Sequence, residues 1–363
     1  MESRLHQMTS RELLEDLLQK ADIDARLRSD APDSWLAVWS SLPWQPVEYR
    51  ASAIDYQTAY FTGACEEFED ISLVIQNDGK PSAIWPLSAW WQSGVHVGSC
   101  GGPVVVPLFG SEVGKRTAKR LFRSAIRFVQ ELSGVLGCHE TKYLSRMDLP
   151  SEAVVSGWHH QLLAGGASIG VRHELTLNLE RDAATIRAGF RRRYKSLVSA
   201  GLKRWVVDIQ SGAGVNYERW NEFRRLHRTV AGRVTRTPLT WDLQWNMLRA
   251  REAFLVGLYD PQESMRMVGG GFFEITRDEA AYSVGVYDRT LFDTPLGHVV
   301  QARAIEEMKR LGLRRYVIGE RPYPGDKPVP TPKELDIANF KQGFASHHAA
   351  NFVLTLCAAG HER

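Results

Sequence analysis

The chain has 363 residues, which is more than one ordinary hydrophobic core organises, so its length predicts two domains. Hydrophobic residues make up 44% and charged residues 24%, a composition that excludes a largely disordered chain, while a net charge of +3 points to no particular partner. No apolar run approaches the roughly 18 residues of a membrane span, and the first ten residues lack the apolar centre of a signal peptide, so we expect a cytoplasmic protein.

The N-terminal half predicts two helices, a hairpin and a long helix. Leucines at helical spacing predict a first helix over 11–28, capped by Ser10 or Thr9, and a second helix ends near Pro43. An Asp-Gly pair between the β-prone runs 71–75 and 81–87 is typical of a hairpin. The helix expected next covers 111–136 and is stopped by Gly137.

The C-terminal half repeats this order of elements. The ranges that follow are two helices, three antiparallel strands, a helix and a further strand: 220–229, 239–250, 253–259, 268–275, 281–287, 295–311 and 315–318. Both halves therefore predict antiparallel strands, then a helix, then a strand. We place the domain boundary near His173, with domains over 1–173 and 174–363, and expect an α/β (α+β) fold in which helices flank two mixed, mostly antiparallel sheets.

Two basic stretches without acidic residues suit a polyanion such as a pyrophosphate, a CoA phosphate or an RNA backbone. The first covers 187–204, where Gly201 is expected to separate a helix from the next strand, and the second covers 224–236. A solvated helix face is the alternative, although such faces usually intersperse acids with bases. The expected phosphate-binding residues are Arg191, Arg192, Lys195 and Arg233.

A short helix near the C-terminus is sharply delimited by its sequence. Thr331 and Glu334 form a capping box, Pro332 suits the first helical position, and a proline-rich loop from Gly319 precedes them. This helix would present Phe340 and Lys341 at its end, on supports stiff enough for a functional site. The alternative is that the lysine is an ordinary surface residue at a helix terminus.

Four motifs in the second half resemble, in the same order, those of the Fem family of envelope-building enzymes. They are RRRYKSLVSAGL from Arg191, YSVGVYD from Tyr282, the helix start before His298, and NFKQGF from Asn339, and they span about 175–356. The resemblance implies two fused acetyltransferase-like (GNAT) domains, an aminoacyl-tRNA donor and a peptidoglycan-precursor amine as acceptor. It also implies that Lys341, beside Phe340, is the functionally critical lysine. We expect Phe340, Tyr282, Tyr287 and His298 to contact substrate.

The sequence differs in two ways from the families that it resembles, and these differences leave the identity of the donor and the acceptor open. The long helical arm of some Fem proteins has no room between 182 and 208, and the tighter similarity is to Fem-like proteins of surface-polysaccharide synthesis. An acetyl-CoA enzyme would carry a glycine-rich phosphate loop, but the segment 289–297 does not fit one. The glycines at 269–271 open a strand and instead predict a bulge or a close backbone approach.

The sequence therefore predicts direct attack by an acceptor amine on an activated acyl ester or thioester. Lys341 would stabilise the developing negative charge, and Glu320 and Asp288, each at the end of a strand, are candidate bases. We expect no permanently bound cofactor and no metal. The expected donor is aminoacyl-tRNA or acyl-CoA.

The expected partners are a nucleotide-linked envelope precursor and tRNA, without DNA; no membrane span is expected, and peripheral membrane association is left open. The N-terminal domain would serve as scaffold and acceptor surface. The alternatives are an acyl-CoA-dependent N-acyltransferase of a nucleotide-linked amino sugar and a non-catalytic nucleic-acid or nucleotide-sugar binding module.

Overall fold

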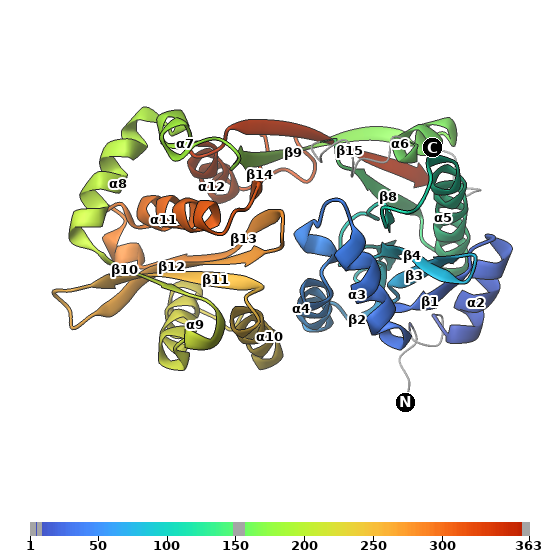
Figure 1. The fold of residues 1–363 in the computed structure, drawn as a ribbon, viewed down its shortest axis with the longest axis horizontal. Coiled ribbons are helices and arrows are strands. Elements are labelled where there is room, and N and C mark those ends of the chain that lie inside the picture. The colour runs from blue at the N-terminus through green and yellow to red at the C-terminus, as the bar shows by residue number, and fades with distance from the viewer. Residues whose placement is uncertain (1–4, 6–8, 148–156, 358–363) are drawn as a thin grey trace. The chain divides into compact units, whose positions relative to one another are not determined.

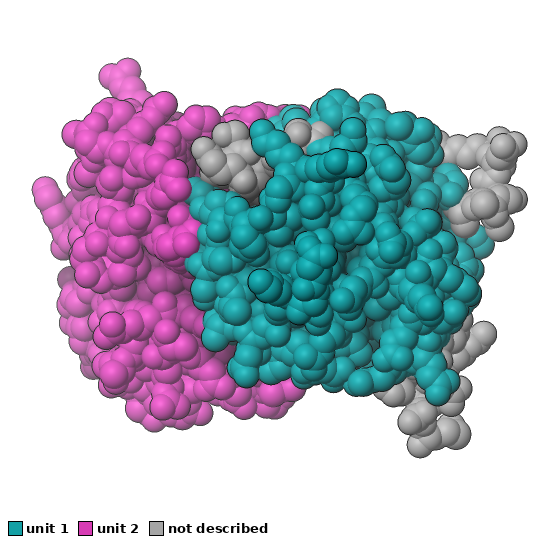
Figure 2. All heavy atoms as spheres, turned by 45° about the vertical axis from the view of Figure 1, so that its right-hand side comes forward, with its two compact units in different colours: residues 1–172, 350–363 teal, residues 173–349 magenta. Residues whose placement is uncertain are grey.

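A computed structural model describes residues 5, 9–147 and 157–357, and the chain divides into two compact units (Figure 2). Unit 1 comprises Met1–Arg172 and Ala350–Arg363, and unit 2 comprises His173–Ala349. The chain enters unit 2 within strand β9 (Ser168–Asn178) and leaves it within β15 (His347–Cys357). The sequence assigned all of 174–363 to the second domain. The structure differs because the end of β15 pairs with β8 (Glu140–Ser145) of unit 1.

Unit 1 contains two small sheets besides the β8–β15 pair, with strand orders β1-β3-β4-β7 and β2-β5-β6. Its helices are α2 (Arg11–Lys20), α3 (Pro32–Ser41), α4 (Ala51–Thr62), α5 (Lys115–Leu136) and α6 (Trp158–Ala164). Its other strands are β1 (Ala25–Leu27), β2 (Glu67–Asp70), β3 (Leu73–Asn77), β4 (Lys80–Trp85), β5 (Ser88–Trp91), β6 (Val95–Gly98) and β7 (Leu108–Phe109).

The predicted hairpin is confirmed as β3–β4. Asp78 and Gly79 both have positive φ values, 52° and 71°, which is the conformation of a tight hairpin turn. The predicted helix over 11–28 is wrong in its second half. Helix α2 ends at Lys20 because Asp22, with φ 57°, reverses the chain, and β1 then pairs with β3.

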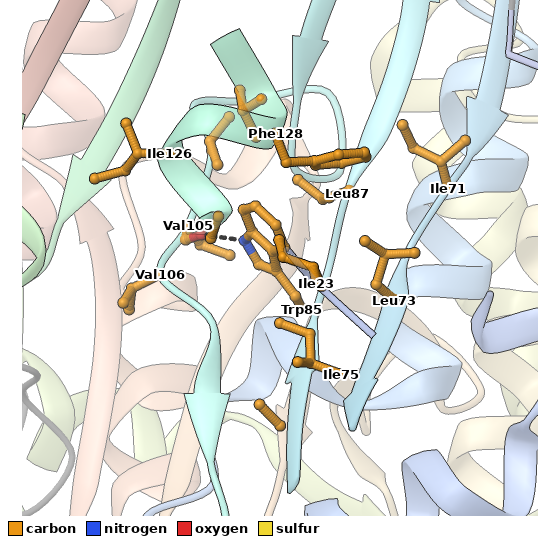
Figure 3. Close-up of a cluster of buried hydrophobic side chains, with 14 of the residues drawn as sticks. Ile23, Ile71, Leu73, Ile75, Trp85, Leu87, Val105, Val106, Ile126 and Phe128 are labelled. Atoms are coloured by element: carbon orange, nitrogen blue, oxygen red, sulfur yellow. Dashed lines mark hydrogen bonds between the residues drawn. The ribbon is translucent and has the colours of Figure 1, made fainter. Parts of the chain in front are cut away.

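Trp85 lies at the centre of the core of unit 1 (Figure 3). Its side chain is 0% exposed, and the indole packs against Phe128 and Trp158, with ring centroids 6.2 and 6.5 Å away. The indole N–H donates to the carbonyl oxygen of Val105 at 2.7 Å, so this buried polar group is satisfied.

We expect Trp85→Ala to lower the free energy of unfolding of unit 1 by about 3–5 kcal/mol, because it opens a large cavity and leaves a buried carbonyl unpaired. Urea unfolding followed by circular dichroism measures this change. Leu36→Ala is the matched control, since Leu36 is 60% exposed and its loss should change the free energy by about 0.5 kcal/mol or less. A loss below about 1 kcal/mol for Trp85→Ala would contradict this account of the core.

Unit 2 is built on a sheet with the strand order β10-β11-β12-β13-β14-β9 (Figure 1). The strands are β10 (Val206–Gln210), β11 (Ala253–Asp260), β12 (Arg266–Ile275), β13 (Glu279–Tyr287) and β14 (Arg315–Glu320), followed by β9. Its helices are α7 (Ala183–Gly189), α8 (Arg192–Arg204), α9 (Tyr217–Ala231), α10 (Pro238–Arg249), α11 (Leu296–Arg310) and α12 (Pro332–Gln342). Neighbouring strands are antiparallel except β13 and β14, so the predicted mixed, mostly antiparallel α/β fold class is confirmed.

Helix α11 covers one face of this sheet, and α9 and α10 cover the other (Figure 1). The glycines of β12 allow both layers to approach the strand closely. A Cβ atom at Gly270 would lie 3.1 Å from the ring of Phe223 in α9, and one at Gly271 would lie 2.8 Å from Val300 in α11. The predicted close backbone approach is therefore observed. No helix of the described segments is long and apolar enough to cross a membrane.

Candidate functional site

Strands β13 and β14 pair over only three residue pairs, and the pairing ends at Ala281 and Val317. Both strands are irregular beside this point. The register of β13 shifts at Ser283, and that of β14 shifts between Val317 and Gly319. The extra residue of β13 is Ser283, so this strand carries a β-bulge two residues before Gly285. A parallel pair that ends in two bulged strands leaves room for another group between them.

The side chain of Lys341 reaches this point from α12. Its amino group lies 5.5 Å from the ring centroid of Tyr282 on β13, and it would lie 2.6 Å from a Cβ atom at Gly319 on β14. The glycine adopts a φ of 129°, a conformation that residues with a Cβ atom rarely accept. The structure thus brings together the two strand ends and the lysine that the sequence singled out.

Helix α12 holds the lysine in a fixed position because both of its ends are anchored. At its start the predicted capping box is confirmed, with Thr331 N–H donating to Glu334 at 2.7 Å and Glu334 N–H donating to the threonine hydroxyl at 3.3 Å. At its end, Arg191 donates to the carbonyl and the side-chain oxygen of Asn339 at 3.1 and 3.0 Å. The tyrosine hydroxyl of Tyr194 donates to the carbonyl of Phe340 at 3.1 Å.

Arg191 is thus committed to the helix and braces it, a structural role that the sequence did not predict. Gly343, where α12 ends, has an ordinary φ of −67°, so the backbone conformation does not require a glycine there. Its missing side chain has a different cause: a Cβ atom there would lie 2.1 Å from the ring of Tyr194. The glycine therefore lets the end of α12 pack directly on α8.

The amino group of Lys341 is half-buried in an environment that weakens its basicity. Burial lowers the pKa of Lys341, and the carboxylate of Glu320 partly offsets this effect. A desolvated amino group close to strand ends can donate strong hydrogen bonds to a developing negative charge. Of the two candidate bases, Glu320 is the one whose charge acts on the lysine, and it is exposed at the end of β14.

Asp288 has partners of its own. Its carboxylate accepts from Thr290 N–H and hydroxyl at 3.0 and 2.7 Å and from Arg266 at 2.8 Å. Burial raises the pKa of Asp288, but these hydrogen bonds outweigh it and lower the pKa overall. A carboxylate held in this way caps the turn after β13, and the structure gives it no contact with Lys341.

A row of three phenols, of which Tyr282 and Tyr287 are half-buried and Tyr316 is buried, begins at Tyr282 beside the lysine. The hydroxyls of Tyr282 and Tyr287 lie 3.0 Å apart, and Tyr316 donates to the side-chain oxygen of Gln301 at 2.7 Å. Burial raises the pKa of all three tyrosines, so they remain neutral hydrogen-bonding groups. The sequence did not identify Gln301. The signal that could have identified it is its position, since it is a polar residue on the apolar face of the helix over 295–311.

His298 belongs to an aromatic cluster that includes Phe340, the neighbour of Lys341 in the sequence. Its ring contacts Tyr194 and Phe340 edge-on, with centroids 4.5 and 5.1 Å away. Burial, together with Arg193 and Arg191, lowers the pKa of His298 to about 4, so the imidazole is neutral near pH 7. Phe340 and His298 thus form an apolar wall, and their contact with substrate stays a prediction.

The four expected phosphate-binding residues do not form one surface. Arg192 is exposed at the start of α8, and Lys195 donates to the carbonyl of Ala188 at 2.8 Å. Arg233 follows α9 on the opposite face of the sheet. The prediction that Gly201 ends the basic helix is also wrong: the residue lies inside α8, where a Cβ atom would meet Val299 of α11 at 2.4 Å.

The sequence matches no protein-family model and no curated protein, but solved structures share its fold over most of its length. FemX has a TM-score of 0.61 at 12% identity, covering 91% of this chain and 96% of that one. L-PGS from Bacillus licheniformis has a TM-score of 0.54 at 11% identity, covering 97% and 93%. The C-terminal domain of a putative lysylphosphatidylglycerol synthetase from Agrobacterium fabrum has 0.55 at 9%, covering 89% and 92%. The chain therefore shares the fold of FemX and of these two further structures.

Proposed function

We propose that the protein transfers an acyl or aminoacyl group from an activated ester or thioester to an amine of a cell-envelope precursor. One observation carries the proposal: the amino group of Lys341 lies where the pairing of β13 and β14 ends. The fold shared with FemX supports it. The envelope precursor, a peptidoglycan peptide or a nucleotide-linked amino sugar, comes from the sequence resemblance.

The protein must stabilise the developing negative charge, accept a proton and position the acyl group. The acceptor nitrogen attacks the carbonyl carbon, a carbon–nitrogen bond forms, and the bond to the donor oxygen or sulfur breaks. Lys341 would donate a hydrogen bond to the carbonyl oxygen as it becomes negative. Glu320 would accept the proton that the amine loses, directly or through water. The neutral phenol of Tyr282 and the wall formed by Phe340 would hold the acyl group in line.

The donor is the least constrained part of the proposal. Aminoacyl-tRNA is the donor that the sequence resemblance implies. A second candidate, an acyl-CoA donor for an N-acyltransferase of amino sugars, is supported by the start of α11. The N–H of Leu296 in this helix donates to the carbonyl of Thr294 at 3.0 Å. The helix has no side-chain cap, however, so the N–H groups of Gly297 and His298 in its first turn remain for a phosphate.

A mass-spectrometric donor screen tests the proposal. Purified protein is offered aminoacyl-tRNAs and acyl-CoAs, each with a panel of peptidoglycan precursors and nucleotide-linked amino sugars. Transfer from charged tRNA would support the aminoacyltransferase, and transfer from thioesters alone would support the second candidate. RNA or nucleotide-sugar binding without any transfer from either donor class would favour a non-catalytic binding module.

A further inference from the structure

An arginine-lined pocket lies between α9 and α10, on the face of the sheet opposite α11. Its volume is about 430 Å³, which is within the usual range of small-ligand sites. Five of its eleven lining residues are arginines and none is acidic. We call it the arginine pocket; its arginines are Arg224, Arg225, Arg228, Arg233 and Arg236.

Trp241 lines the arginine pocket and contacts two of its guanidinium groups. The guanidinium carbons of Arg236 and Arg224 lie 5.1 and 5.9 Å from the centroid of its ring. The indole is 8% exposed, so it does not offer a free face to a nucleobase. Its contribution is to hold planar cations in place by cation–π contacts.

The charges of the arginine pocket are not balanced by the residues that line it. Arg224 donates to the side chain of Asn221 at 3.5 Å, and no ion pair joins the five arginines to an acid in the described part of the chain. One guanidinium nitrogen of Arg236 is buried without a hydrogen-bond acceptor among the described residues. A buried donor left unpaired costs free energy, and that cost is recovered when an anion accepts from it.

The neighbouring imidazole adds no charge. Burial and the positive charge of Arg236 lower the pKa of His227 to about 4, so the ring is neutral near pH 7. The cationic character of the pocket therefore comes from guanidinium groups, which match phosphate oxygens in pairs.

We propose that the arginine pocket binds a diphosphate group, carried either by a soluble nucleotide or by a lipid. A concave site with several convergent guanidinium groups suits a compact, multiply charged anion better than an extended nucleic-acid backbone. This inference does not rest on the proposed transferase activity, because binding is measured without turnover and the residues of the pocket are distinct from those around Lys341.

Isothermal titration calorimetry with inorganic pyrophosphate and with uridine diphosphate tests the site on the full chain. Arg228→Ala and Arg233→Ala remove exposed members of the pocket and should leave the fold intact. Each should weaken binding about ten- to hundred-fold, because a charge-assisted hydrogen bond is lost. Arg249→Ala is the matched control: it removes an exposed arginine at the end of α10, outside the pocket, and should leave the affinity unchanged.

Further arms distinguish the source of the diphosphate. Vesicles of phosphatidylcholine with and without a polyprenyl diphosphate are compared in a flotation assay with uridine diphosphate as competitor. Retention that needs the diphosphate lipid and the two pocket arginines would indicate a lipid carrier, and binding of uridine diphosphate alone would indicate a soluble one. No binding of any diphosphate, equal losses in Arg249→Ala, or retention of RNA alone would overturn the proposal.

Discussion

Lys341→Met is expected to lower kcat for acyl transfer by about 10²–10³-fold, the usual effect of removing one preorganised donor to a developing negative charge. Methionine keeps the length and apolar character of the stem, so α12 and its capping box should remain in place. The KM values should change much less than kcat, since the interaction is made mainly in the transition state. Steady-state kinetics with the donor found in the screen measures both.

The same substitution should not destabilise the protein, which separates a functional lysine from a structural one. Burial lowers the pKa of Lys341 in the folded state. At any pH below the pKa of the unfolded state, the protonated lysine therefore makes folding less favourable. At pH 7, Lys341→Met should therefore unfold at the same or a higher urea concentration than the wild type. This difference should disappear as the pH rises through the range in which the lysine loses its proton.

Lys341→Arg is the informative companion, because it keeps a positive charge but replaces a compact ammonium group with a broad planar one. Partial recovery of kcat would support charge stabilisation. Wild-type activity in Lys341→Met would contradict the role assigned to this lysine, whatever the donor.

Local signals in the sequence located elements in both units. The capping box at Thr331 and the Asp78-Gly79 turn each specify a backbone conformation through neighbouring residues alone, and the structure confirms both. The long strands β9 and β15 carry no comparable signal. They were missed because their pairing partners lie far away in the sequence, and so the return of the chain to unit 1 was missed as well.

At the candidate site, too, contacts between residues far apart in the sequence could not be predicted. The signals that delimit the helix placed Lys341 at the end of α12, and the resemblance of NFKQGF to the Fem family singled it out. The brace formed by Arg191 could not be inferred, because a basic stretch does not reveal which arginine is used internally and which is free. Nor does a basic stretch reveal that Arg233 and Arg192 lie on opposite sides of a sheet. That separation follows from β12, whose two faces receive different helices.

Gly319→Ala is expected to lower kcat by about tenfold or more, acting through the position of Lys341. A Cβ atom at this residue would lie 2.6 Å from the lysine nitrogen, so the amino group must move away from the strand ends. The φ of 129° adds a backbone cost of about 1–3 kcal/mol to folding. Stability and activity should therefore both fall, and the two effects need separate controls.

Gly312→Ala supplies the first control, because Gly312 also has a positive φ, 77°, but a Cβ atom there would have no neighbour within 4 Å. It should lose stability and keep its kcat. The double variant Gly319→Ala/Lys341→Met supplies the second. If the glycine acts by positioning the lysine, the double variant should be no slower than Lys341→Met alone, since the amino group that the new methyl displaces is already gone. Additive losses of activity would show instead that Gly319 shapes the site independently, and the space between β13 and β14 would then need an occupant other than the lysine to explain its geometry.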